Sequence, residues 1–289
     1  MIESLLEMFS YSFIARAFLV GIPVALCAAL LGVSLVLKRY SMIGDGLSHV
    51  GFGALAVAAA LNLAPLEVAI PIVVVAAFLL LRLSENSKIK GDAAIAIISS
   101  SALAIGVIIA TLNKGMNTDI NSYLFGSILA TTEQDAVLSL VLSAVVIVLF
   151  VFFYHKIFAV TFDESFARAT GTRANIYNMV IALLTALTIV VGMRIMGTLL
   201  ISSLIIFPAL TSMRLCKTFR SVILCSAVLS VICFVVGMSA SFLYETPTGA
   251  SIVAANIAAF LLFWLASLLR RKICLLYTSP SPRDISGSR

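Results

Sequence analysis

Charged residues are scarce in this chain of 289 residues. Asp, Glu, Lys and Arg together make up 11% of it, whereas hydrophobic residues make up 62% and the mean hydropathy is +1.15. Soluble globular domains carry about 25% charged residues. The shortage of charge therefore excludes a soluble globular fold. It predicts an all-α, polytopic integral membrane protein embedded in a lipid bilayer.

The usual signatures of an enzyme are missing as well. No Gly-x-x-x-x-Gly-Lys-Ser/Thr loop occurs, so the chain carries no recognisable nucleotide site. The two histidines, His49 and His155, lie too far apart for a His-x-x-x-His zinc motif, and no Gly-x-Ser-x-Gly elbow is present. The five cysteines show no Cys-x-x-Cys spacing, which indicates structural thiols. We expect no enzymatic activity and no permanently bound cofactor.

Long charge-free stretches are abundant. Seven of them run for 19 residues or more, and roughly 20 apolar residues cross the hydrocarbon core as a helix. They are Ala17–Leu37, Ala93–Asn113, Ala136–Tyr154, Ala174–Met193, Ile195–Met213, Ser221–Tyr244 and Thr246–Leu269. Two further stretches, Met42–Leu61 and Leu66–Leu83, carry isolated charged residues. The sequence predicts eight or nine transmembrane helices.

The basic residues indicate an orientation. When the stretches are threaded alternately, fourteen Lys and Arg fall on one side of the membrane. Only Arg16, Lys114 and Arg194 fall on the other side. Lys and Arg accumulate on the cytoplasmic side, so we expect the N-terminus outside and the C-terminus inside. The net charge of +6 is thus explained by the Lys and Arg residues that orient the protein in the membrane, and we expect no binding of nucleic acid.

The end of the chain changes character. The last sixteen residues, CLLYTSPSPRDISGSR, are rich in Ser, Pro and Arg and have no hydrophobic periodicity. We interpret residues 274–289 as a non-native or disordered tail. Residues 1–273 then form a single transmembrane domain.

The stretch IGDGLSHVGFG places Asp45 and His49 inside an apolar segment. Residues four apart lie within about 40° of each other on a helix, so both side chains share one face. Carboxylate and imidazole suit a divalent transition metal, and ionisable groups within spans usually mark an ion path. The surrounding glycines leave room for neighbouring backbones. The alternative is an Asp–His hydrogen bond that fixes packing without any ion.

Two other segments are distinctive. The polar stretch VTFDESFARATGTRAN predicts a helix over Phe162–Gly171, with acidic residues at its start and glycine at its end. This helix either docks onto a partner or merely connects two spans. Its candidate docking residues are Phe162, Asp163, Glu164, Ala167, Arg168 and Gly171. The stretch GMRIMGTLLISSLIIFPALTSMR is interrupted by glycine and proline, which predicts either a broken helix beside a pathway or a kinked hairpin.

Four passages, read in order, resemble the membrane permease subunit of the bacterial zinc/manganese/iron ABC-importer family. They are GDGLSH at 44–49, DINSYLFGSILATTEQD at 119–135, TALTIVVGMRIMGTLLISSLIIFPA at 185–209 and SFLYETPTGASIV at 241–253. Together they extend over most of the chain. Within the family, the chain looks most similar to the zinc-uptake permease.

The resemblance implies an ATP-driven importer in the bacterial cytoplasmic (inner) membrane, with zinc, or else manganese or iron, as cargo. It implies a homodimer of permeases, two cytoplasmic ABC ATPase subunits and an extracytoplasmic metal-binding protein. Asp45 and His49 would coordinate the metal, and Phe162–Gly171 would be the helix that couples to the ATPase. Two alternatives stay open, namely an ATP-independent secondary ion transporter and an ABC permease for metal chelates.

Overall fold

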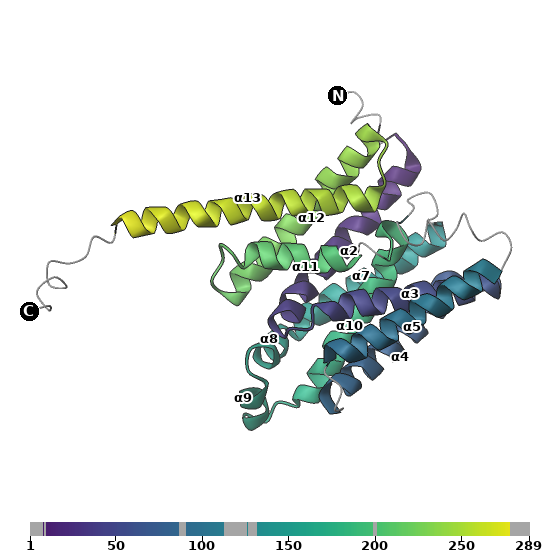
Figure 1. The fold of residues 1–289 in the computed structure, drawn as a ribbon, viewed down its shortest axis with the longest axis horizontal. Helices are drawn as coiled ribbons and strands as arrows, with labels where there is room; N and C mark the ends of the chain where they lie inside the picture. The colour runs from purple at the N-terminus through teal and green to yellow at the C-terminus, as the bar shows by residue number, and fades with distance from the viewer. Residues whose placement is uncertain are drawn as a thin grey trace, which may run out of the picture.

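The computed structural model describes residues 8, 10–86, 91–112, 126, 132–198 and 201–277, and within these it contains helices and no strand (Figure 1). The helices are α2 (Ser12–Leu37), α3 (Met42–Ala60), α4 (Pro65–Asn86), α5 (Gly91–Leu112), α7 (Glu133–Phe152), α8 (Tyr154–Phe162), α9 (Glu164–Ala169), α10 (Ala174–Met196), α11 (Ile201–Ser212), α12 (Phe219–Tyr244) and α13 (Thr248–Tyr277). The prediction of an all-α fold is confirmed.

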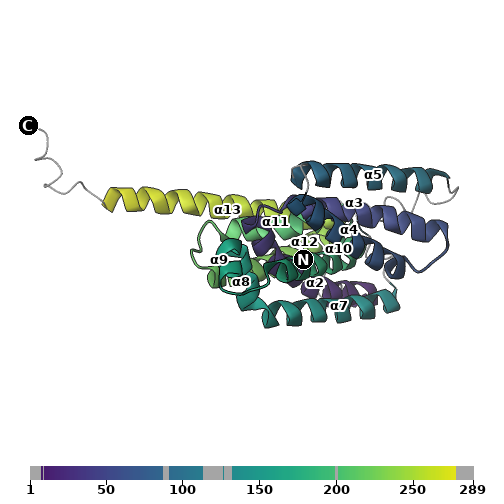
Figure 2. The ribbon, with the colours of Figure 1, turned by 90° about the horizontal axis from the view of Figure 1, so that it is seen from below.

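Eight of these helices are long and apolar enough to cross a membrane, which confirms a multi-pass membrane protein. They are α2, α3, α4, α5, α7, α10, α12 and α13. The apolar segments of α2, α3 and α10 are the most buried, whereas those of α5 and α13 are the most exposed. In Figure 2, α5 lies along the outside of the bundle and α13 extends beyond it. The core is thus built around α2, α3 and α10.

The predicted span Ile195–Met213 is wrong as a complete crossing. Its helix, α11, has 12 residues and is about 18 Å long, short of the roughly 30 Å hydrocarbon core. A Cβ atom on Gly192 would meet Ile201 and Val24, and one on Gly51 would meet Met193. Because Val24 and Gly51 lie midway along α2 and α3, the ends of α10 and α11 meet in the middle of the bundle.

The helices α10 and α11 therefore form a hairpin that begins and ends at the same side of the bundle. Residue 194, which we expected outside, lies in the last turn of α10, next to Met193 at this central position. If the other seven long helices each cross once, the number of complete crossings is odd, as in the predicted topology, and the orientation of the termini stays a prediction. The hairpin thus preserves the parity on which the predicted orientation depends.

Glycines allow the helices around α3 to approach closely. A Cβ on Gly53 would lie 2.9 Å from the carbonyl oxygen of Ala102 in α5, and one on Gly106 would lie 2.9 Å from Gly53 Cα. On α2, a Cβ on Gly32 would collide with the backbone of Ile205 in α11. Such small residues let backbones pack directly in membrane bundles.

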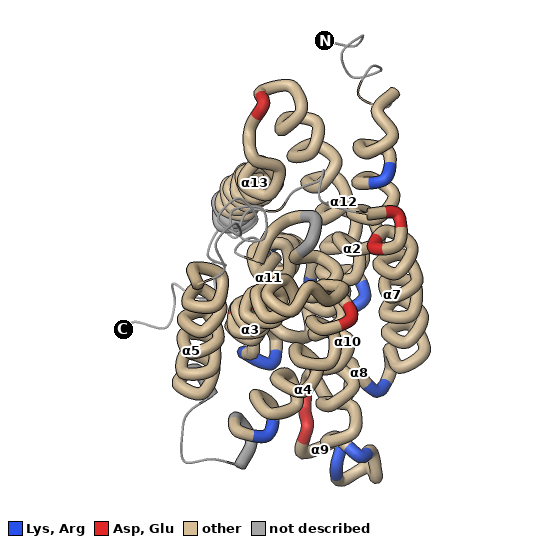
Figure 3. The backbone as a smooth tube through the Cα atoms, turned by 90° about the vertical axis from the view of Figure 1, so that its right-hand side faces the viewer, with Lys and Arg blue, Asp and Glu red and all other residues tan. Residues whose placement is uncertain are grey.

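One end of the bundle is marked by α8 and α9 and by a concentration of Lys and Arg (Figure 3). The last turn of α2 reaches this end, because Lys38 contacts Glu164 in α9. The α13 helix runs to Tyr277, four residues into the predicted tail, and residues 278–289 lie outside the described residues. The boundary at 273 and the nature of the tail stay predictions.

Candidate metal-binding site and coupling helix

Asp45 and His49 lie in the first two turns of α3, on one helix face as the spacing predicts. Asp45 Oδ2 and His49 Nε2 are 3.7 Å apart. The hydroxyl of Ser48 donates to the backbone carbonyl of Asp45 at 2.7 Å, a local bond within the helix. Because α3 begins at Met42, the pair lies near the end of the bundle that holds α8 and α9, and not at its centre.

The glycines define the direction in which the pair points. Gly46 packs against α5 and Gly44 packs against α11. At 100° per residue, the direction of Asp45 and His49 falls between those two contacts. The pair thus points into the gap between α5 and α11.

The site is only partly enclosed. The Asp45 side chain is 38% exposed and the His49 side chain is 12% exposed. His49 Nδ1 is buried and has no hydrogen-bond partner among the described residues. That part of the chain contains no group of three or more His, Cys, Asp or Glu side chains able to hold a metal. Zinc sites in proteins typically use about four ligands, so the described residues of one chain supply an incomplete set.

The predicted helix at Phe162–Gly171 is present, but it is divided. Asp163 has an extended backbone that separates α8 from α9, and its carboxylate accepts a hydrogen bond from the Phe166 N–H at 2.9 Å. Phe162 therefore ends α8 and does not begin α9. Asp163 is therefore the N-cap of α9, a position at which Asp is strongly preferred.

Gly171 ends α9, as predicted. Its φ of +82° is left-handed, a conformation that glycine adopts without penalty. The Thr172 N–H donates to Ala167 O at 2.9 Å, and the Gly171 N–H donates to Arg168 O at 3.0 Å. These two bonds form a Schellman motif, which closes the helix and reverses the chain toward α10.

The predicted docking residues differ in what they contact. Ala167 is 1% exposed and packs against Val160 and Ala174, so it anchors α9 to α8 and α10. Phe162 and Phe166, by contrast, are 59% and 66% exposed. Phe166 is not among the docking residues predicted from the sequence. The Phe162 ring lies 4.9 Å from the Phe158 ring and 5.6 Å from the Phe219 ring, measured between centroids. Exposed apolar patches typically mark an interaction surface.

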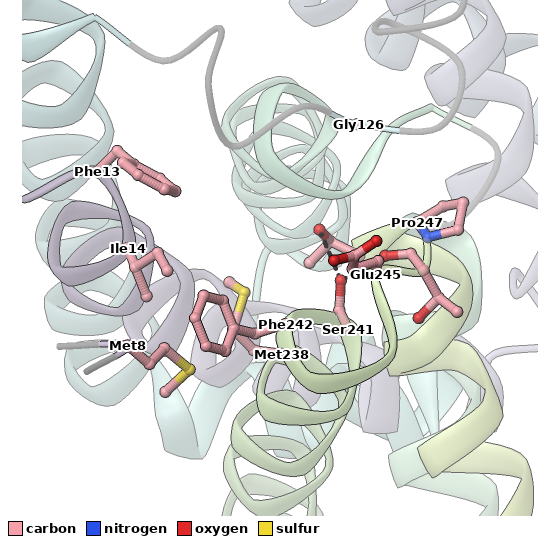
Figure 4. Close-up of a pocket in the computed structure, with 11 residues that line it drawn as sticks. Met8, Phe13, Ile14, Gly126, Met238, Ser241, Phe242, Glu245 and Pro247 are labelled. Carbon is pink, nitrogen blue, oxygen red and sulfur yellow. Dashed lines mark hydrogen bonds between the residues drawn. The ribbon is translucent and has the colours of Figure 1, made fainter. Parts of the chain in front are cut away.

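A separate cavity of about 540 Å³ lies at the other end of the bundle, among the start of α2, the end of α12 and the start of α13. Figure 4 shows Ser241, Phe242 and Glu245 around it, and Ser241 donates to the Thr246 carbonyl at 2.6 Å. These three residues belong to the passage SFLYETPTGASIV at 241–253. Apolar side chains dominate the lining, so the cavity offers little for holding a cation.

A bundle of apolar helices with an ionisable pair inside one span, together with a capped helix pair outside the spans, defines a polytopic transport protein. Residues 10–267 match the model of the ABC 3 transport family, and the chain belongs to this family. It is therefore an ABC transporter permease and not an enzyme. Three of the four passages, 44–49, 185–209 and 241–253, lie mostly or wholly within the described residues, whereas residues 119–125 and 127–131 of the fourth lie outside them.

Relatives cover nearly the whole chain. It is 30% identical over 267 residues to the manganese import system permease protein ScaB of Streptococcus gordonii, covering 91% of this chain and 96% of that one. It is 29% identical to the high-affinity zinc uptake system membrane protein ZnuB of Haemophilus influenzae, with 89% and 97% covered. The structure of PsaBC from Streptococcus pneumoniae with Fab superposes with a TM-score of 0.83 at 30% identity, with 91% and 95% covered.

Proposed function

We propose that this chain is the permease of an ATP-driven importer of divalent transition metal ions, with zinc as the preferred cargo. The pairing of Asp45 and His49 on one face of α3 carries the proposal. These ligand types suit zinc, manganese and iron alike, and the named relatives import more than one of these metals. Zinc rests on the resemblance to the zinc-uptake permease.

A second copy of the chain would complete the site. The pair points away from its own helix between α5 and α11, and His49 Nδ1 has no partner within the described chain. Two facing copies would bring two carboxylates and two imidazoles together, which supplies the ligand number typical of zinc. A homodimer is therefore part of the proposal.

Each end of the bundle would contact a different partner. The end with α8 and α9 would face the cytoplasm and dock an ABC ATPase through Phe162, Phe166 and the residues around them. The opposite end would receive the extracytoplasmic metal-binding protein. This arrangement places the N-terminus outside and the C-terminus inside a bacterial inner membrane. Because the pair lies near the proposed cytoplasmic end of α3, the ion would bind to it late in its passage into the cell.

The test is uptake by the purified permease reconstituted with its ATPase in liposomes, supplied with zinc, manganese or iron and the external binding protein. We expect ATP-dependent accumulation of the free ion, with zinc taken up at the lowest concentration. Uptake without ATP would indicate a secondary transporter, and uptake of a chelate but not of the ion would indicate a chelate permease. Recovery from manganese starvation but not from zinc starvation would refute the preference for zinc.

A further inference from the structure

A buried lysine connects the end of α2 to α9. The ammonium of Lys38 donates to Asn178 Oδ1 at 2.5 Å, to Glu164 Oε2 at 3.3 Å and to the Val160 carbonyl at 3.3 Å. Only 7% of the Lys38 side chain is exposed, and Asn178 is 2% exposed. One cation thus joins α2, α8, α9 and α10 at a single point.

Glu164 is held from several sides. Besides Lys38, it accepts hydrogen bonds from Arg168 at 2.6 Å and from Asn178 at 3.2 Å. Burial alone would raise the pKa of Glu164, but the bonds from Arg168 and Asn178 and the charge of Lys38 together lower the pKa below its ordinary value of 4.5. The carboxylate is therefore ionised at neutral pH, and the pairing with Lys38 is between full charges.

The turn after Lys38 is short and hydrogen-bonded. Arg39 has a left-handed φ of +61°, and the Tyr40 N–H donates to Leu35 O at 2.8 Å. The Ile43 N–H then donates to Tyr40 O at 3.0 Å, within the first turn of α3. Such closely bonded turns leave little freedom between the helices that they join. A displacement of Lys38 would therefore move the start of α3, where Asp45 lies.

Removing one member of a buried ion pair leaves the other charge without compensation, which is strongly unfavourable. Separating α9 from Lys38 would impose that penalty on the Lys38 ammonium, which is 7% exposed, whereas the Glu164 side chain is 32% exposed and would be partly solvated. A force on α9 is thus expected to move Lys38 before it breaks the contact. The contact with the buried amide of Asn178 adds α10, whose partner in the hairpin, α11, packs against Gly44 beside the pair.

We propose that Lys38, Glu164 and Asn178 are positioning residues that couple the movement of α9 to the α2–α3 turn and so to Asp45 and His49. The inference rests on the proposed function, in which an ATPase acts on α9. None of the three residues contacts the ion. Their role is to convert a displacement of α9 into a change in the geometry of the metal ligands.

The decisive variant is Lys38→Met, which keeps the length of the side chain and removes its charge. In liposomes with the ATPase, we expect ATP hydrolysis to continue while metal imported per ATP falls at least about tenfold. The matched control is Lys217→Met, because Lys217 is exposed between α11 and α12 and should leave the ratio unchanged. Lys38→Arg keeps the charge and should restore most of the coupling.

A purely structural contact would give a different result. In that case ATP hydrolysis and metal uptake would fall together with the amount of assembled complex. Metal imported per ATP in Lys38→Met would then equal that of the wild type, and this result would overturn the inference. If Lys38→Met does not assemble, Asn178→Leu decides, because Asn178 is buried on α10 and is not among the predicted docking residues. A lower amount of metal imported per ATP is expected, and an unchanged amount overturns the inference. A wild-type complex that imports no metal would instead refute the proposed function itself.

Discussion

Replacing Gly171 tests whether the shape of α9 matters for coupling. The backbone there is left-handed, with φ of +82°, and no atom of the described residues lies within 4 Å of the position that a Cβ would occupy. A side chain therefore meets no obstacle in the part of the chain that the structure describes, and the cost there comes from the backbone conformation. That cost is about 1–2 kcal/mol for most L-residues and less for Asn, which adopts this conformation more readily.

A loss of about 1–2 kcal/mol reduces the population of the native turn by roughly 5–30-fold relative to its opened forms. The helix α9 has six residues, too few to persist without its caps. We expect coupling to decrease in the order Gly171, Gly171→Asn, Gly171→Ala, measured as metal imported per ATP in liposomes. Amide hydrogen exchange of residues 164–172 should increase in the same order.

In this series Gly171→Asn is the matched control, because it adds a side chain of larger size than alanine at a smaller backbone cost. If bulk against the ATPase determined the effect, Asn would be worse than Ala. That order, or equal coupling in all three proteins, would refute the argument from backbone strain.

Three further predictions concern packing, the tail and pH. Gly53→Ala places a Cβ 2.9 Å from the Ala102 carbonyl oxygen and should destabilise the bundle by about 1–3 kcal/mol. The melting temperature in detergent should therefore decrease, and an unchanged melting temperature would contradict the close contact of α3 and α5. Deletion of residues 278–289 should leave membrane insertion and uptake unchanged, and a loss of either would show that the tail is native. Acidification from pH 8 to pH 6 should reduce uptake, because neutral imidazole binds metal in competition with protons. The lowered pKa of Glu164 means that its carboxylate is protonated only on acidification below about pH 4.5, so the contact with Lys38 should contribute nothing to that decrease in uptake.

Features set by local physics could be predicted from the sequence. Charge-free stretches of sufficient length became helices, and the spacing of Asp45 and His49 fixed their common face. Asp163 and Gly171 carry cap chemistry that depends only on their immediate neighbours. The pattern of residues did not indicate the break at Asp163, which separates Phe162 from α9, or the helix α8 before it.

Features set by depth or long-range contact could not be predicted. Hydropathy alone cannot distinguish the α10–α11 hairpin from two complete crossings, because both are apolar throughout. The contact of Lys38 with Glu164 and Asn178 joins residues 126 and 140 positions apart, and no sequence pattern marks it. The identity of the metal is not set by a carboxylate and an imidazole, since zinc, manganese and iron all accept both.

The most direct test of the metal site is uptake by the Asp45→Asn variant, which keeps the shape of the side chain and removes its charge. Even the loss of an outer partner of a metal ligand costs about 10–100-fold, so we predict that metal uptake falls by more than about 100-fold. The variant should still assemble with the ATPase and hydrolyse ATP, since Asp45 is on α3 and not on the proposed docking helix. The control Glu133→Gln, at an exposed position, should import metal normally. Normal uptake by Asp45→Asn would contradict the account and show that Asp45 and His49 serve only to pack α3.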